Sequence, residues 1–347
     1  MNKQKIVIIG AGIVGASVAY HLAKRNQDVT IIERHPAAAR GVTEKSFGWI
    51  HTTHRIAPEY WHLYDAALEE YHALQQELSE LKIHWHGALT WGIPPLRVQP
   101  HFQKLNREQL EALEPNLKEY PDEAMFVSEE GAVDPIGVTE LLLSKAQEYG
   151  AKVLFGTNVT QLQQEDSRLV GVHTSKGFLE SDVVVLAAGT GIPELCNPIG
   201  CHVPVTSSPS ILIRMKTTNK RIHTLISNAQ FEARQLTDHK LLAAEDYIDE
   251  SEENGPEAIG KRAFDTLRRS LKDGNQLELE SITVGMRPMP EDGYPIVGFQ
   301  DHIKGLYLAV MHSAITLAPL IARLAAGEII DRESRSELAP CRISRFQ

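Results

Sequence analysis

The chain has 347 residues, of which 42% are hydrophobic and 23% are charged, the balance of a globular protein with a large core. Its 35 basic and 45 acidic residues give a net charge of −10, so a nucleic-acid partner is not expected. No hydrophobic run approaches the roughly 20 residues of a transmembrane segment.

The N-terminal sequence, MNKQKIVIIG, runs directly into an expected strand and lacks the pattern of a secretory signal. The three cysteines, Cys196, Cys201 and Cys341, are an odd number and do not suggest a disulfide framework. We therefore expect a cytoplasmic protein in which Cys196 and Cys201 are structural thiols, which we favour over a redox-active pair.

The first elements form a βαβ unit. Residues 5–9, KIVII, predict a buried parallel strand, a GxGxxG turn follows, and a helix then leads to a second strand that ends at Glu33. Gly10 makes the tight turn, Gly12 lets the backbone approach a pyrophosphate at the helix N-terminus, and Gly15 lets the helix pack on the sheet. Glu33 can accept hydrogen bonds from a ribose. The motif alone fits NAD or FAD, and a glycine turn that binds nothing is the disfavoured alternative.

The remaining elements alternate between helical and strand patterns. Hydrophobic residues repeat every three or four positions from Pro58 to about Leu81, which predicts a helix. Asn106 and Asp134 stand where helix N-caps are expected. Further expected elements are strands in 83–93 and 151–163, a strand and glycine turn over 182–191, antiparallel strands between 203 and 248, a helix within 252–273, and a strand, turn and helix over 305–330.

Several of these segments resemble the FAD-dependent amine oxidoreductases, the relatives of D-amino-acid oxidase, glycine oxidase and sarcosine oxidase. The resemblance is carried by GAGIVGASVAYHLAKRNQDVTIIER at the start, VVVLAAGTGIPEL at 183–195, and GMRPMPEDGYPIVGF with GLYLAVMHSAITLAPLIARLAAGEI at the end. SFGWI at 46–50 and the segment 132–159 are also similar to that family. It spans residues 5 to about 330.

The resemblance implies an α/β fold in which a Rossmann-like FAD-binding domain carries an inserted antiparallel-sheet α+β substrate domain. We expect the FAD-binding domain to comprise 1–82, 132–204 and 284–332. The substrate domain would comprise 83–131 and 205–283. The last segment, 333–347, is polar and basic, and we expect a poorly ordered tail.

The resemblance also implies the residues that hold FAD. Those near the pyrophosphate and ribose would be Gly10, Gly12, Ile13, Val14, Gly15, Glu33, Arg34, Thr43, Ser46, Val159, Ala188 and Gly189. Those beside the flavin ring would be Ile50, His51, His312, Ser313, Ala314, Ile315, Thr316 and Leu317. FAD would be non-covalent, because the segment before the RPMPEDG turn has no cysteine.

The implied reaction is oxidation of a C–N bond in an amino acid or a related primary or secondary amine. A hydride passes to flavin N5, and the imine hydrolyses to a keto acid. Oxygen or a carrier would accept the electrons. Two alternatives stay open: a flavin dehydrogenase that reduces a quinone or protein carrier, and a non-catalytic flavin-binding subunit. The oligomeric state, including a homo-oligomer, is also open.

Arg287 and His51 are the candidate catalytic residues. Gly285 permits close backbone approach and Pro288 biases Arg287 toward extended geometry. In the resembling family, the arginine of this segment holds the substrate carboxylate, which a guanidinium can bind with two parallel hydrogen bonds. The alternative is a structural salt bridge to Glu291 or Asp292.

Three residues depart from the family pattern. Glu44 and Lys45 stand where small residues are expected, and Glu44 would repel phosphate if it pointed inward. Ala314 stands where glycine is more usual, and we expect strain there if its φ is positive. The pairs His51/His54 and His84/His86 lack cysteine or carboxylate partners in their spacing, so no metal site is expected.

Overall fold

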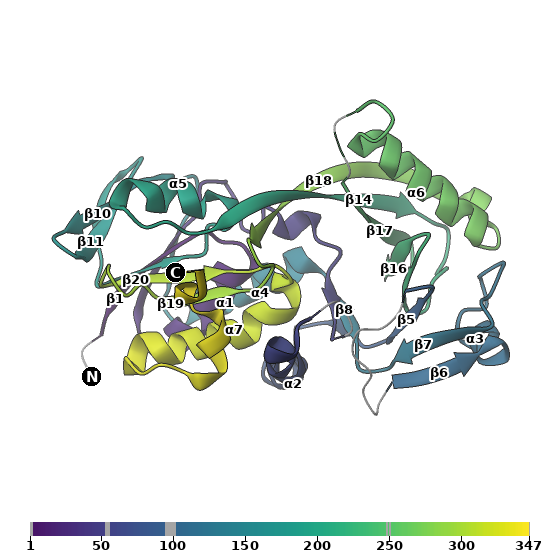
Figure 1. The fold of residues 1–347 in the computed structure, drawn as a ribbon, viewed down its shortest axis with the longest axis horizontal. Coiled ribbons are helices and arrows are strands. Elements are labelled where there is room, and N and C mark those ends of the chain that lie inside the picture. Colours follow the sequence, from purple (N-terminus) through teal and green to yellow (C-terminus); the bar gives the residue numbers. More distant parts are fainter. Residues whose placement is uncertain (1–2, 53–55, 94–101, 248, 250, 347) are drawn as a thin grey trace.

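The computed structural model describes residues 3–52, 56–93, 102–247, 249 and 251–346. The molecule is built around two large sheets, one of six strands and one of eight, and each sheet forms the centre of one part of the molecule. Two long strands of the second sheet, β14 (Val205–Lys216) and β18 (Glu278–Pro290), extend from that part to the first (Figure 1). The predicted boundary between residues 283 and 284 falls inside β18, so the two parts share a continuous strand.

The first sheet has six strands in the order β19-β20-β13-β1-β2-β9. Its pairs are parallel except for β19 with β20, which are antiparallel. The strands are β1 (Lys5–Ile9), β2 (Asp28–Ile32), β9 (Lys152–Leu154), β13 (Val183–Leu186), β19 (Ile296–Phe299) and β20 (Leu306–Val310).

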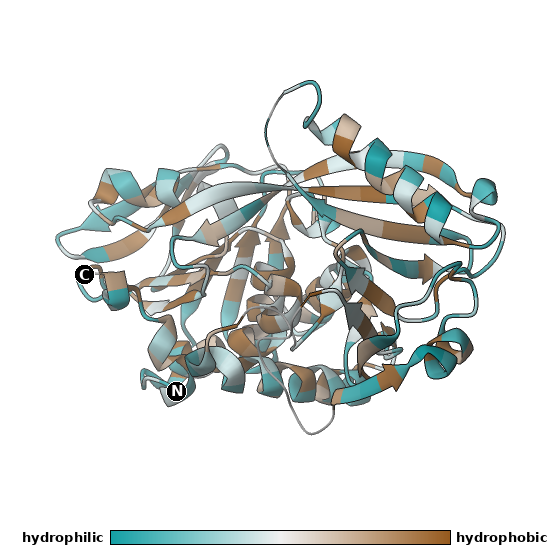
Figure 2. Ribbon diagram, turned by 45° about the vertical axis from the view of Figure 1, so that its right-hand side comes forward, coloured by the Kyte–Doolittle hydropathy of each residue, from teal (hydrophilic) through white to brown (hydrophobic). Residues whose placement is uncertain are grey.

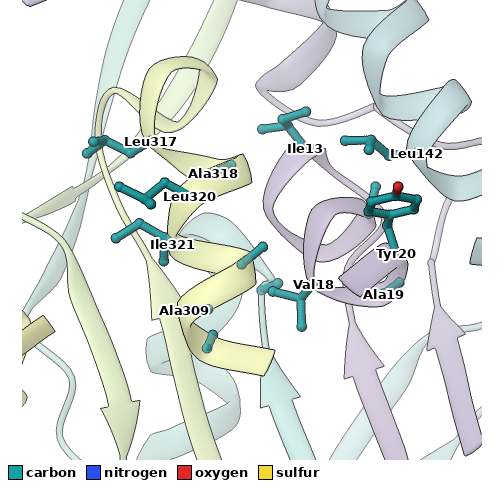
Figure 3. Packing of buried hydrophobic residues seen from close by; sticks show 14 of the residues in the cluster. Ile13, Val18, Ala19, Tyr20, Leu142, Ala309, Leu317, Ala318, Leu320 and Ile321 are labelled. Carbon is teal, nitrogen blue, oxygen red and sulfur yellow. The ribbon is translucent and has the colours of Figure 1, made fainter. Parts of the chain in front are cut away.

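Both faces of this sheet are covered. On one face lie α1 (Ile13–Lys24), α2 (Trp61–Glu77), α4 (Pro135–Glu148) and α7 (Ala314–Asp331), whose buried side chains meet between α1 and α7 (Figure 3). On the other lie α5 (Ile192–Cys196) and a small sheet of β10 (Val159–Glu165), β11 (Arg168–Thr174) and β12 (Gly177–Glu180). Ile6 and Ile8 pack into the first layer and Val7 and Ile9 into the second, which explains the unbroken hydrophobic run in β1.

The second sheet has eight strands in the order β18-β14-β17-β16-β15-β5-β7-β6. Besides β14 and β18, its strands are β5 (Ala88–Trp91), β6 (Phe102–Asn106), β7 (Glu123–Val127), β15 (Leu225–Asn228), β16 (Glu232–Thr237) and β17 (Lys240–Asp246). All its pairs are antiparallel except β15 with β5.

The amphipathic helix α6 (Pro256–Ser270) covers one face of this sheet and alternates hydrophobic and hydrophilic residues along its length (Figure 2). The short helix α3 (Arg107–Leu113) follows β6. The opposite face of the sheet packs Leu212, Leu225 and Leu242 against Phe47 and Trp49. A three-stranded sheet of β3 (Trp49–Ile50), β8 (Gly131–Val133) and β4 (Ile83–His84) joins the two parts.

The predicted α/β fold class is confirmed, and so are several local signals. Asn106 caps α3 in a capping box with Gln109, and the Asp134 side chain accepts from Ile136 N at the start of α4. The helix expected over 58–81 is shorter, because Pro58–Tyr60 form a 3₁₀ turn and α2 ends at Glu77. None of the helices in the described part of the chain has the length and hydrophobicity that crossing a membrane requires.

The expectation of a poorly ordered tail is wrong. Residues Ser336–Cys341 and Ile343–Phe346 form 3₁₀ turns, with the Leu338 and Cys341 side chains fully buried. The guanidinium of Arg342 pairs with the buried carboxylate of Glu328 on α7. A buried carboxylate needs such a partner, so this segment is part of the core.

Candidate active site

Two adjoining cavities lie where the strands of the six-stranded sheet end. The glycine-turn cavity, about 490 Å³, extends along the α1 N-terminus from Glu33 to Gly189. The roofed cavity, about 500 Å³, lies between the α7 N-terminus and one face of the eight-stranded sheet, its roof. The two share lining residues, so they form one continuous trough: Ile13, Val42, Thr43, Pro288, Met311 and Ala314.

Each glycine of the first motif has a separate steric reason. Gly10 has φ +103°, and a Cβ there would lie 2.5 Å from Ala187 O. A Cβ at Gly15 would overlap the Gly10 carbonyl, so Gly15 sets the packing of α1 on the turn. A Cβ at Gly12 would lie 3.2 Å from Thr43 Oγ1, which itself accepts a hydrogen bond from Ile13 N at 3.2 Å. The N-terminus of α1 therefore has room for an anion only because the residue at position 12 has no side chain.

Glu33 is buried at the end of β2 and holds the turn as well as facing the cavity. Its Oε2 accepts from Ala11 N at 2.8 Å and its Oε1 accepts from His35 N at 2.9 Å. Each carboxylate oxygen has a second lone pair, so capacity for a ribose hydroxyl is left. The predicted pyrophosphate and ribose residues that also line this cavity are Gly10, Gly12, Ile13, Val14, Arg34, Thr43, Val159, Ala188 and Gly189.

The floor of the roofed cavity comes from two segments. Ser46 and His51 come from the segment after β2, and His312, Ser313, Ala314 and Ile315 come from the start of α7. Thr316 does not line the cavity: its Oγ1 accepts from His51 N and donates to Trp49 O, both at 3.2 Å, and so joins α7 to β3. Ile50 and Leu317, expected beside the flavin, lie instead in the hydrophobic core.

The positive φ considered for Ala314 is found one residue earlier in the chain. Ala314 is the first residue of α7 and has no positive φ, whereas Ser313, its N-cap, has φ +56°. The left-handed turn that favours glycine is therefore at Ser313.

Glu44 and Lys45, the two other residues that depart from the family pattern, differ in whether they line a cavity. Glu44 forms an ion pair with Arg40 at 3.1 Å, and its backbone carbonyl accepts from Arg214, so its carboxylate is not in the cavity lining. Lys45, in contrast, lines the floor of the roofed cavity. The expected repulsion of phosphate by Glu44 is not supported.

Arg287 lies in the roof, on β18, and is part of the cavity lining. Its guanidinium donates to Ser208 Oγ and Pro209 O, both at 3.1 Å, and pairs with Asp246 Oδ1 at 3.2 Å. The alternative partners expected from sequence are wrong, since Asp292 pairs with Arg345 at 2.6 Å. The ion pair of Arg287 is instead made across β14 to β17.

The charged roof residues that were missed from sequence include Glu232, Arg234 and Asp246. Arg234 is buried and donates to Phe47 O at 2.6 Å and to Val133 O at 3.0 Å, so it fixes the floor segment to the roof. Glu232 and Asp246 line the cavity with Arg287. Side chains alternate between the two faces of a strand, but the sequence does not show which face of β16 or β17 lines the cavity. The strand register shows that Glu232 and Asp246 lie on the same face.

Burial shifts the pKa values of three cavity residues, and it raises that of Glu245, with Asp246 acting in the same direction. It raises the pKa of Glu232 to about 8, and the neighbouring Asp246 and Glu245 act in the same direction. It lowers the pKa of His312 to about 4, with the positive charge of Arg287 adding to the effect. At neutral pH these shifts favour the neutral form of His312 and the protonated form of Glu232.

Of the histidines weighed as metal ligands, His51 lines the roofed cavity, whereas His84 and His86 line neither cavity. His54 is outside the described residues, and the His84 and His86 ring centroids are 5.6 Å apart. Within the described ranges, no three His, Cys, Asp or Glu side chains are arranged to hold a metal ion.

The trough fits FAD as the resemblance implies. The glycine turn leaves space at the α1 N-terminus, the Glu33 carboxylate lies beside it, and the α7 N-terminus lies at the far end. No cysteine lines either cavity, and all three thiols are buried and free.

Comparison with known proteins agrees with this architecture. A D-amino acid dehydrogenase of Cereibacter sphaeroides is 26% identical over 99% of this chain and 95% of its own length. A glycine oxidase of Pseudomonas aeruginosa is 25% identical over 97% of this chain and 98% of its own. The crystal structure of glycine oxidase from Geobacillus kaustophilus has a TM-score of 0.86 at 20% identity and covers 99% of both chains, which shows the same fold.

The model of the family described as FAD dependent oxidoreductase matches residues 5–328. That range includes the glycine turn, both long strands and all of α7 except its last turn. The chain therefore belongs to the FAD dependent oxidoreductase family, and FAD is its cofactor.

Proposed function

We propose that this chain oxidises the C–N bond of an amino acid, and that Arg287 binds the substrate carboxylate in the roofed cavity. The observation that carries the proposal is the position of this guanidinium. It lines the cavity that adjoins the FAD trough, and two neutral oxygens of β14 hold it there. Its one ionic partner among the described residues, Asp246, has a side chain that is 84% exposed and can be displaced.

Bound FAD would supply the acceptor for the hydride that leaves the substrate carbon. The chain's own residues would bind and orient. Gly12 and the α1 N-terminus would hold the pyrophosphate, and Glu33 the ribose, without a covalent bond. Backbone N–H groups at the start of α7 would stabilise negative charge on the ring, and Thr316 keeps that helix end joined to β3.

His51 would contribute by position. It is buried beneath the roof, its ring centroid lies 5.8 Å from Trp49 and 5.5 Å from Tyr64, and its backbone is fixed by Thr316. We expect it to limit the space over the flavin and so to orient the substrate.

The dehydrogenase and oxidase relatives both support an amino-acid substrate, but they suggest two different electron acceptors. The names D-amino acid dehydrogenase and glycine oxidase share amino-acid oxidation and differ in where electrons go. We propose oxygen, or a quinone or protein carrier, as the electron acceptor, to be decided by reoxidation in air.

The test is anaerobic mixing of the holoenzyme with a panel of D- and L-amino acids, glycine and N-methylglycine. Loss of the oxidised-flavin absorbance near 450 nm is expected with at least one of them. Rapid recovery in air identifies an oxidase, and recovery only with a quinone identifies a dehydrogenase. No bleaching by any amino acid or amine would contradict the proposal.

A further inference from the structure

We propose that Glu232 binds the ammonium group of the substrate and accepts the proton that the amine must lose before the carbon is oxidised. This inference rests on the proposed function, and it assigns the second end of the substrate, opposite the carboxylate held by Arg287.

The strand register places Glu232 and Arg287 on the same face of the roof. Arg287 is opposite Ser208 and Asp246 is opposite Ser210, and those two serines are two residues apart on β14. Glu232 is opposite Ala244, two residues from Asp246 on β17. Side chains two residues apart share a face, so Arg287, Asp246 and Glu232 lie on one face of the sheet, and all three line the roofed cavity.

The separation of the two groups suits an amino acid. The guanidinium reaches across β14 to Asp246 on β17, and β16 with Glu232 is the next strand. Adjacent strands are about 4.8 Å apart, which leaves roughly 5–10 Å between the two charged groups. An amino acid whose carboxylate and ammonium groups are each hydrogen-bonded to one of these side chains spans that distance.

Glu232 lacks a cation within the described chain. Its Oε2 accepts one long hydrogen bond, from Ser227 Oγ at 3.4 Å, and Oε1 has no partner among the described residues. No described lysine or arginine is within ion-pair distance of it, whereas Asp246, a neighbouring carboxylate of the same cavity, is already paired with Arg287. A half-buried carboxyl facing a cavity without a counter-ion is the place where a ligand's cation gains most.

The local charges bring this carboxyl into a useful range for proton transfer. Burial, Asp246 and Glu245 raise the pKa of Glu232 to about 8, and Arg287 opposes them. The other ionisable groups lining the cavity are Lys45, His51 and His312. An arriving ammonium favours the ionised carboxylate, and a base whose pKa is near the working pH transfers protons effectively.

The proton step is simple to balance. The amine N–H bond breaks, an O–H bond forms on Glu232, and the electron pair stays on nitrogen. The neutral amine can then support loss of hydride from its carbon to the FAD of the proposed function, and the proton on Glu232 returns to solvent as the product leaves.

Two ligands of similar shape separate the ammonium from the carboxylate. 2-Aminoisobutyrate has both groups but no α-hydrogen, so it cannot be oxidised, and isobutyrate has the carboxylate alone. Binding of each to the holoenzyme is followed by the change in flavin absorbance. Glu232→Gln is expected to weaken 2-aminoisobutyrate by about 10- to 100-fold and isobutyrate by less than about 2-fold. Glu278→Gln, an exposed position on β18, is the matched control and should change neither.

Proton release tests the proposal on the wild-type protein, whether or not the variant folds. At pH 7 Glu232 is largely protonated, so binding of 2-aminoisobutyrate should release protons and binding of isobutyrate should not. Calorimetry in buffers of different ionisation enthalpy measures that number. Equal proton release with both ligands would overturn the assignment.

The pH dependence of flavin reduction tests the proton transfer. In the wild type, kcat/KM for an oxidised amino acid should rise with a limb near pH 8, and in Glu232→Gln that limb should move to the ionisation of the substrate amine. If amino acids reduce the flavin and neither the limb nor 2-aminoisobutyrate binding changes, Glu232 has no such role and the proposed function stands. If 2-aminoisobutyrate binds through Glu232 but no amino acid reduces the flavin, the site stands and the proposed function fails. If neither ligand binds, both are wrong.

Discussion

Arg287 and Asp246 are joined across the roof sheet, with Nη2 of the arginine 3.2 Å from Oδ1 of the aspartate. One strand, β14, separates them, and the arginine also donates to two oxygens of that strand. Three-quarters of the arginine side chain is buried, whereas most of the aspartate is exposed. The guanidinium is thus held by neutral partners as well, and its ionic partner is the more exposed member of the pair.

Replacing Arg287 should lower activity without unfolding the protein. Loss of a charged contact to the substrate costs about 2–4 kcal/mol, so Arg287→Ala should reduce kcat/KM for an amino acid by about 30- to 1000-fold. Arg287→Lys keeps the charge but loses the paired hydrogen bonds, and should fall in between. FAD content and Tm should stay near wild type. Normal amino-acid oxidation by Arg287→Ala would show that Arg287 does not bind the substrate carboxylate.

Removing the competing carboxylate should help the substrate to bind. In Asp246→Asn the substrate carboxylate no longer displaces an anion from Arg287, and an exposed ion pair is worth about 0–1 kcal/mol. The Kd of isobutyrate should therefore fall by up to about 5-fold. Weaker binding in Asp246→Asn would show that Asp246 positions Arg287 instead of competing for it.

FAD should leave the protein on denaturation. Cys196, Cys201 and Cys341 are buried and line neither cavity, so no thiol is available to tether the flavin. After acid precipitation the yellow colour should be in the supernatant, where chromatography should identify FAD. Colour that stays in the pellet would point to a covalent bond through another residue type.

The residue to exchange for glycine is Ser313. Its φ of +56° is unfavourable for a side chain, so Ser313→Gly should raise the free energy of unfolding by up to about 1 kcal/mol. Ala314→Gly places glycine in the first turn of α7 and should lower it by a few tenths to about 1 kcal/mol. Opposite signs in denaturant titrations of the two apoproteins are the expected result. Stabilisation by Ala314→Gly would contradict the backbone assignment.

Acid should destabilise the fold through His21. The ring is buried on α1, its Nε2 has no hydrogen-bond partner in the described structure, and burial lowers its pKa to about 3, with Lys24 and Arg323 acting in the same direction. Its unfolded pKa is about 6.5. The folded state binds this proton less readily, so the contribution to stability is complete above pH 6.5 and is lost as the pH falls toward 3.

The variant His21→Leu should therefore lose less stability than the wild type between pH 7.5 and pH 5. The difference should reach about 2 kcal/mol at pH 5, because each pH unit is worth about 1.4 kcal/mol there. The exposed His239→Leu is the control. Parallel stability curves for wild type and His21→Leu would exclude His21 as the acid-sensitive group.

Features with local causes could be predicted from sequence. The glycine turn, the Asn106 capping box and the Asp134 cap each depend on residues within a few positions of one another. Arg287 could be singled out as a candidate because Gly285 precedes it closely and Pro288 follows it. Its partner could not, since Asp246 reaches it only through the register of three strands.

The errors also have physical causes. The last fifteen residues have a polar and basic composition, but three hydrophobic side chains, Leu338, Cys341 and Ile343, and the pairing of Arg342 with Glu328 bury them. Glu232 was missed because a glutamate in a strand is ordinary unless the face it occupies is known. Ile50 and Leu317 adjoin residues that line the cavity, and only the packing shows that their own side chains lie in the core.

The strand order of the first sheet determines when each of its strands can pair while the chain is being synthesised. Ile6 on β1 is opposite Val183, and Val184 is in turn opposite Leu306, so the middle of the sheet is assembled from three distant parts of the chain (Figure 1). At ribosomal rates of about 5–20 residues per second, β1 waits roughly 10–35 s for its partner β13. During that time the KIVII strand has an unpaired hydrophobic edge, which invites pairing with other nascent chains. Yield in a cell should therefore depend on chaperones that shield the first strand and on the speed of translation through residue 310.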